Sequence, residues 1–186
     1  MPVYPDQDAT TRLDGRVIDA MLPFLRESYG TCSSVHRLGR AARRAIDMAR
    51  EQLAELVGAQ ANQVVFTSGA TEANNLAIKG VAGGHPVGRM LIGAIEHTSV
   101  ATAANALAVR GWTVDEISVD GEGRVGLDAT EVVRDEAAVA TRVRDAGARL
   151  HTDAVQAAGK LPVDFAGLGV HLECRFRRTR STVQRA

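Results

Sequence analysis

The 186-residue sequence predicts an α/β protein in three layers, with helices flanking a mostly parallel sheet. Short apolar segments of strand length alternate with longer segments in which apolar residues recur every three or four positions. Hydrophobic residues make up 45% and charged residues 24% of the chain, which are ordinary values for a globular protein and exclude a disordered one. Glycines stand mostly at the junctions between these segments, where turns need them.

The charge balance excludes several classes of partner. The chain has 22 basic and 22 acidic side chains, so no net charge attracts it to nucleic acid or to an anionic membrane. Its apolar stretches are shorter than the roughly 20 residues of a membrane-spanning helix, and residues 1–13 carry Asp6 and Asp8 rather than a secretory signal. Cys32 and Cys174 suggest neither a disulfide framework nor a zinc site. We therefore expect a cytoplasmic protein without a metal.

The first third of the chain predicts two helices. The first covers residues 16–24, where apolar residues fall on one side, and a loop of small and polar residues follows over 29–36. The second is a long amphipathic helix over residues 38–57, which Gly58 ends.

Strands and helices then alternate. A brief strand is expected at 64–66 and a helix from the following turn to about residue 81. Next come a buried strand at 90–95, an alanine-rich helix at 99–110 and a strand at 113–119. This order is typical of βαβ units with a parallel sheet.

The last third begins with a turn at residues 120–123, which precedes a weakly amphipathic helix at 127–146 and a strand at 149–153. From His171 onward five arginines oppose one glutamate, and no clean periodicity remains. We interpret residues 1–170 as one domain and residues 171–186 as an arginine-rich tail. A solvated tail explains that composition better than an RNA- or lipid-binding arm, because aromatic residues are not interleaved.

The turn between the strand at 64–66 and the next helix carries the strongest chemical signal. It reads Thr-Ser-Gly-Ala-Thr-Glu from Thr67 to Glu72. Unpaired amides at a helix N-terminus, the close approach that Gly69 allows and nearby hydroxyls can hold a phosphate. The alternative is an ordinary helix start, in which Ser68 or Thr71 caps and Glu72 favours the first turn. The turn alone does not decide between them.

Two further polar positions follow predicted strands. His97 comes after the strand at 90–95, and Asp153 and Gln156 follow the strand residues 149–152. Ligand sites of α/β proteins lie at the carboxyl ends of strands, so these side chains are expected near the phosphate turn. A phosphate cradle, an imidazole and a carboxylate fit a flat phosphorylated ring with a basic nitrogen. Pyridoxal 5'-phosphate is such a molecule.

These motifs resemble the cysteine desulfurases, fold-type I pyridoxal-phosphate enzymes of the class V aminotransferase group. The resemblance covers roughly residues 3 to 170, and its segments are residues 8–11, 34–39, 67–77, 96–97 and 153–160. It implies the large, cofactor-binding domain of that group. A selenocysteine lyase or an amino-acid aminotransferase of the same class is an alternative that the turn motif does not separate.

The resemblance also implies a role for each site residue. Ala70 and Thr71 would hold the cofactor phosphate, and His97 would stack on the pyridine ring and take part in proton transfer. Asp153 would pair with the protonated ring nitrogen, while Gln156 would hydrogen-bond the ring hydroxyl oxygen. The substrate would be L-cysteine, giving alanine and a protein persulfide. A sulfur-acceptor scaffold protein and a homodimer are the partners that the family implies.

The sequence also departs from the family pattern. The Ser-x-His-Lys motif, whose lysine forms the Schiff base, does not follow residue 170, and neither Lys79 nor Lys160 matches it. A strand and loop are missing near residues 134–139, which would leave a gap in the sheet. The C-terminal domain and the sulfur-accepting loop are also absent. We therefore expect impaired catalysis and poor solubility. A frameshift before residue 171 would explain the abrupt change to an arginine-rich composition. The alternative function is that of a non-catalytic fragment that binds or dimerises.

Overall fold

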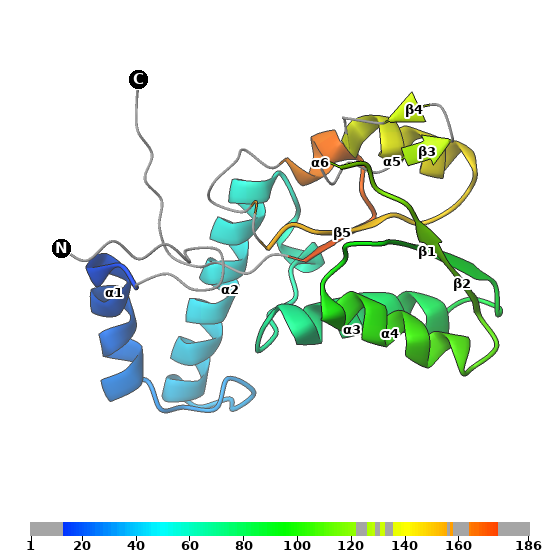
Figure 1. Ribbon diagram of the computed structural model, residues 1–186. Coiled ribbons are helices and arrows are strands. Elements are labelled where there is room, and N and C mark those ends of the chain that lie inside the picture. The colour runs from blue at the N-terminus through cyan, green and yellow to red at the C-terminus, as the bar shows by residue number, and fades with distance from the viewer. Residues whose placement is uncertain are drawn as a thin grey trace, which may run out of the picture. The chain divides into compact units, whose positions relative to one another are not determined.

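The computed structural model describes residues 13–121, 126–128, 131–132, 136–155, 157 and 164–174. These residues form two compact units. The first unit contains residues 13–66 with 157 and 164, and the second contains the described residues between 67 and 155 and those from 165 to 174. Figure 1 labels the helices and strands of both units.

The first unit begins with α1, which spans Gly15–Arg26. Its N-cap is Asp14, whose carboxylate accepts a hydrogen bond from the Arg16 amide at 2.9 Å. None of the residues of α1 is buried. The helix predicted at 16–24 is confirmed and is slightly longer at both ends.

The second helix, α2, spans Arg37–Val57. The His36 ring caps its start by accepting from the Gly39 amide at 3.2 Å. Gly58 ends it with φ 66°, a left-handed conformation that glycine adopts without a steric cost. The prediction at 38–57 is confirmed, and no described helix is long and apolar enough to cross a membrane.

The strand predicted at 64–66 is wrong. A single 3₁₀ turn, η1, spans Ala61–Gln63, and residues 64–66 after it belong to no strand of the described chain. Val65 is 67% exposed and Phe66 is 48% exposed. Branched and aromatic residues favour a strand only where a neighbouring strand completes the hydrogen-bonded ladder, and the local pattern carries no information about that partner.

The second unit opens with a parallel βαβ arrangement, as predicted. Helix α3 spans Ala70–Gly83, and β1 (Arg89–Gly93), α4 (Thr98–Ala108) and β2 (Thr113–Ile117) follow. The two strands are parallel, with Arg89 opposite Thr113 and Gly93 opposite Ile117. The Ala94 amide continues the ladder by donating to the Ile117 carbonyl at 3.0 Å.

The helix predicted at 127–146 is wrong in its first part. An antiparallel pair, β3 (Gly126–Asp128) and β4 (Glu131–Val132), precedes α5, which spans only Glu136–Asp145. The helical pattern over this segment is weak, and the branched residues Val132 and Val133 favour strands over helix.

The chain then forms β5 (His151–Asp153), the short helix α6 (Phe165–Leu168) and β6 (Leu172–Cys174). Strands β5 and β6 are parallel, with Asp153 opposite Cys174. His171 donates its amide to the Leu150 carbonyl at 3.0 Å and accepts the Leu150 amide on Nδ1 at 3.2 Å. The first residues of the arginine-rich segment therefore belong to the second unit, which the sequence did not predict.

The core of the second unit lies between α3, α4 and the β1–β2 pair. Ala103 and Ala104 are fully buried, and Leu107 is 2% exposed. Partly buried Trp112 packs against this cluster, whose buried members are Ile78, Ala82, Ile92, Val100, Ala103, Ala104 and Leu107. In Figure 1 the strands β1, β2 and β5 lie between α3 and α4 on one side and α5 and α6 on the other. The predicted α/β class is confirmed, and within the described residues β1–β2 and β5–β6 form separate sheets.

Candidate cofactor site

The turn before α3 leaves the helix N-terminus open. Gly69 is the N-cap in an extended conformation, and no side chain caps the helix. The first bond of the helix runs from the Ala73 amide to the Gly69 carbonyl at 3.0 Å, so the amides of Ala70 and Thr71 precede it. A Cβ built on Gly69 would meet no atom within 4 Å. The turn therefore offers amide donors and space to an anion, and neither Ser68 nor Thr71 acts as the cap.

Ser68 binds the first turn of α3 instead. Its amide and its hydroxyl donate to Glu72 Oε2 at 2.6 and 2.5 Å. These bonds, the hydroxyl bond first, lower the pKa of Glu72 below its usual value. Because the folded-state pKa is depressed, the contribution of Glu72 to stability is present above the unfolded-state pKa and is lost as pH falls through the folded value.

Replacing Ser68 by alanine will raise the pKa of Glu72 toward its usual value, because the largest cause of the depression is removed. An NMR titration of the Glu72 side-chain carboxyl carbon measures the change. Thr71→Ala is the matched control, because within the described chain the bonds to Glu72 come from Ser68 and the Thr71 hydroxyl makes none to it. An unchanged Glu72 titration in Ser68→Ala would contradict this account.

His97 stands at the start of α4 with its side chain exposed. Its Nδ1 accepts from the Ser99 amide at 3.2 Å and lies 2.8 Å from the Ser99 hydroxyl oxygen. The imidazole thus caps the helix with one nitrogen while Nε2 is left for another partner. This geometry orients a ring that can face a flat ligand.

Asp153 ends β5 with both carboxylate oxygens engaged. Oδ2 accepts from Asn74 Nδ2 at 2.8 Å, and Oδ1 accepts from the Val155 amide at 3.1 Å. The pKa of Glu96 is raised by burial and, secondly, by the negative charge of Asp153. The folded chain holds the Glu96 proton more tightly than the unfolded chain, so this group lowers stability as pH rises through the raised value.

Asn74 joins the positions that the sequence predicted separately. It lies on α3 one turn beyond Ala70, a rise of about 6 Å. Its amide contacts Asp153 and also donates to the Ser99 hydroxyl at 2.9 Å, which in turn contacts His97. The structure therefore brings the start of α3, His97 and Asp153 to one edge of the second unit.

Three polar residues of this edge were missed by sequence reasoning: Asn74, Ser99 and His151. His151 Nε2 lies 3.0 Å from Asn74 Oδ1, and Asn74 is fully buried. A signal was present in the sequence, because Asn74, Ile78 and Ala82 are spaced by four residues and share one face of α3. A single polar residue on an apolar helix face needs hydrogen-bond partners in the core.

Lys79 lies away from this edge, and two other residues of the sequence analysis are not described. Gln156 and Lys160 lie outside the described residues. Lys79 is exposed on α3. It lies five residues after Asn74, and a rotation of about 100° per residue places it about 140° around the helix axis from Asn74. Lys79 therefore does not share the face that contacts Asp153.

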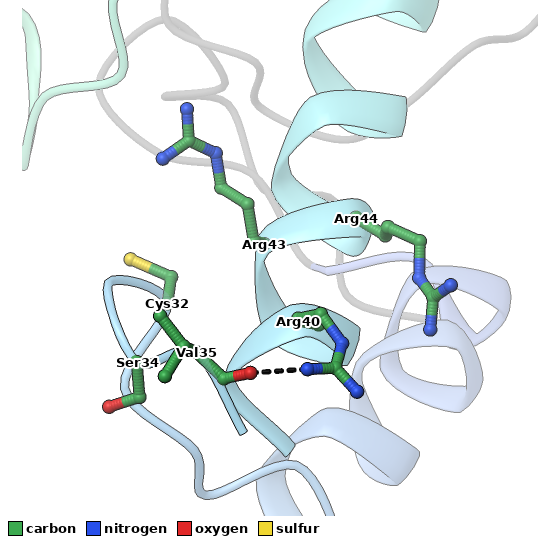
Figure 2. A pocket seen from close by; sticks show the side chains of 6 residues that line it. All are labelled: Cys32, Ser34, Val35, Arg40, Arg43 and Arg44. Atoms are coloured by element: carbon green, nitrogen blue, oxygen red, sulfur yellow. Dashed lines mark hydrogen bonds between the residues drawn. The ribbon is translucent and has the colours of Figure 1, made fainter. Parts of the chain in front are cut away.

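The first unit has a separate hollow of about 470 Å³ beside the start of α2. Its lining includes Cys32, Arg40, Arg43 and Arg44. Figure 2 shows the three guanidinium groups pointing in different directions, and Arg40 donates to the Val35 carbonyl. Arg43 pairs with Asp47 at 3.1 Å. The cations do not converge on a common point, so the hollow is not built like an anion site.

Comparison with known proteins agrees with the motifs. Residues 3–139 match the aminotransferase class-V family. The chain is 38% identical to cysteine desulfurase 2 of Trichormus variabilis over 88% of this chain, and 37% identical to a cysteine desulfurase of Sinorhizobium fredii over 92%. It covers 46% and 50% of those proteins, so it spans about half the length of the curated relatives it matches.

Solved structures give the same result. A NifS-like protein superposes with a TM-score of 0.84 at 32% identity, covering 91% of this chain and 53% of that one. SspA in complex with cysteine superposes with a TM-score of 0.86 at 26% identity, covering 94% of this chain and 56% of that one. The predicted resemblance to cysteine desulfurases is confirmed. The chain belongs to the class-V aminotransferase family.

Proposed function

We propose that this chain binds pyridoxal 5'-phosphate where α3 and α4 begin and β5 ends. We further propose that it belongs to a cysteine desulfurase, which removes sulfur from L-cysteine to give alanine and a protein persulfide. The observation that carries the proposal is the hydrogen bond of 2.8 Å between Asn74 and Asp153. It holds the carboxylate against the helix whose N-terminus would receive the phosphate.

The residues present fit the cofactor at both of its ends. Open amides at Ala70 and Thr71, with the positive end of the α3 dipole, suit a phosphate. Asp153 Oδ1 and Oδ2 are fixed by Val155 and Asn74, which leaves lone pairs for a protonated ring nitrogen. When bound, pyridoxal phosphate supplies an electron sink for negative charge at the α carbon of the amino acid.

The chain's own residues would position the ring and move protons. His97 would pack on the ring and hold a proton at Nε2, because Nδ1 faces the Ser99 amide. Gln156 would donate to the ring hydroxyl oxygen. We also propose that a chain of these 186 residues binds the cofactor without a covalent bond, since the only lysines are Lys79 and Lys160 and neither matches the family's lysine.

Titration of the purified chain with pyridoxal phosphate, followed by its visible absorbance, tests the cofactor proposal. We expect saturable binding that dialysis reverses and that Lys79→Ala and Lys160→Ala leave unchanged. We also propose that this chain alone is catalytically impaired, because it lacks the family's lysine, so we expect sulfide release from L-cysteine at the rate given by free pyridoxal phosphate alone. Absence of saturable binding would overturn the cofactor assignment, and sulfide release above that background would overturn the proposal of impaired catalysis.

A further inference from the structure

Asn74 is the centre of a buried hydrogen-bond network. Its side chain is fully buried, and the Ser99 residue beside it is 6% exposed. Nδ2 donates to Ser99 Oγ at 2.9 Å and to Asp153 Oδ2 at 2.8 Å, and Oδ1 lies 3.0 Å from His151 Nε2. Both amide protons and the carbonyl oxygen of Asn74 are thus engaged inside the second unit.

The chemistry of the partners fixes where each proton lies. An amide nitrogen carries two protons, and here one points to each of its two acceptors. Because the carbonyl oxygen only accepts, His151 must carry a proton on Nε2. Ser99 Oγ accepts from Asn74, so its own proton is directed to His97 Nδ1 at 2.8 Å.

The opposite orientation of the amide does not fit an ionised Asp153. It would place the amide oxygen 2.8 Å from a carboxylate oxygen with no proton between them. It would also turn the Ser99 proton toward Asn74 and away from His97. The charge on Asp153 therefore selects the orientation of Asn74, and that orientation selects the direction of the Ser99 hydroxyl.

We propose that Asn74 is a positioning residue that couples Asp153 to His97 through the Ser99 hydroxyl. The amide holds the carboxylate in place and, through Ser99, gives His97 Nδ1 a hydroxyl donor in addition to the Ser99 amide, with the ring proton on Nε2. Its connection to pyridoxal phosphate rests on the proposed function, but the coupling between the side chains does not. Asn74 itself need not touch a ligand.

The coupling can be tested by long-range ¹H–¹⁵N NMR of the histidine rings in the cofactor-free chain. For the wild type we expect His97 protonated on Nε2 only, and His151 protonated on Nε2. In Asn74→Asp an oxygen replaces Nδ2 beside Asp153 Oδ2, so the two carboxyl groups share one proton and the Ser99 hydroxyl donates to the new oxygen rather than to His97. His97 Nδ1 then accepts from the Ser99 amide alone, and its resonance shifts toward that of an acceptor nitrogen with one donor fewer. His151 keeps an acceptor at the same place, so its Nε2 resonance stays unchanged.

Two further variants keep the test decisive. Ser99→Ala removes the hydroxyl without adding charge near Asp153, and we expect the same direction of shift at His97 with no shift at His151. Asn75→Asp is the matched control, because Asn75 lies next along α3 and its amide donates only to the Thr71 carbonyl, at 2.9 Å, in the described chain. The proposal fails if His97 is unchanged in Asn74→Asp or in Ser99→Ala, or if His151 shifts as much as His97.

A cofactor titration separates this proposal from the proposed function. We expect Asn74→Asp to weaken pyridoxal phosphate binding by about tenfold or more, as expected when hydrogen bonds to a charged group are lost, and Asn75→Asp to leave it unchanged. If the wild-type chain binds no pyridoxal phosphate while Asn74→Asp shows the His97 shift, the proposed function is refuted and the coupling is supported. Normal cofactor affinity in Asn74→Asp without the shift refutes the coupling alone.

Discussion

Replacing Asp153 by asparagine will weaken pyridoxal phosphate binding by about 10- to 100-fold, because a hydrogen bond to a charged group contributes roughly 1.5–3 kcal/mol. Asparagine keeps the shape of the side chain but has one oxygen, so it can accept from Val155 or from Asn74 and not from both. The substitution therefore removes the negative charge together with one of the two hydrogen bonds of the carboxylate. Visible absorbance or the fluorescence of Trp112, the single tryptophan, measures the dissociation constant.

The same variant has a readout that needs no cofactor. The pKa of Glu96 is raised partly by the charge of Asp153, so it will fall toward its usual value when that charge is removed. Asp115→Asn is the matched control: it removes a carboxylate from β2 that forms an exposed ion pair with Arg89 at 2.9 Å. We expect no effect of the control on cofactor affinity. Equal affinity in Asp153→Asn and the wild type would contradict the proposal that Asp153 pairs with the ring nitrogen.

The helices were predictable because their signals are local. Apolar residues at three-to-four spacing and the stop at Gly58 gave α2 to within a residue of its observed span. The same holds for α3, where a small-residue turn precedes a periodic segment. Local sequence also placed β1 and β2, since β1 is largely apolar, β2 has three branched residues in five, and α4 separates the two strands.

The errors concern segments whose structure depends on a partner. Residues 64–66 have strand propensity but pair with nothing in the described chain, whereas Leu172–Cys174 have no clean pattern and pair with β5. Val132 lies in a strand because β3 is beside it, which a weak helical pattern over 127–146 did not reveal. Pairing across many residues of sequence is set by tertiary structure and is not encoded in a window of a few residues.

In the candidate site, too, local features were predictable and long-range contacts were not. Motif spacing was enough to name Ala70, Thr71, His97 and Asp153, because each follows or begins an element with a clear local pattern. The bonds between them run through Asn74 and Ser99, and the partners of Asn74 lie 25, 77 and 79 residues away. The described members of the site all belong to the second unit, so its stability decides whether the site forms.

Replacing Leu107 by alanine will destabilise the second unit by about 2–5 kcal/mol, the usual cost of such a cavity in a packed core. Leu107 is 2% exposed and is the largest fully buried apolar side chain among the described residues. Ala103 and Ala104 on the same helix are too small to fill the space. Because small domains are stable by only about 5–15 kcal/mol, the loss is large enough to unfold a marginal unit.

The fluorescence of Trp112 during urea unfolding measures this effect, because Trp112 packs against the Leu107 cluster and so reports on the second unit. Leu76→Ala is the matched control, since the same methyl groups are removed from α3 at a position that is 53% exposed. We expect its transition midpoint to stay close to that of the wild type. Equal midpoints for Leu107→Ala and Leu76→Ala would mean that the α3–α4 core does not hold the second unit together. In that case Asn74 and Asp153 would lack the rigid support that the cofactor site requires.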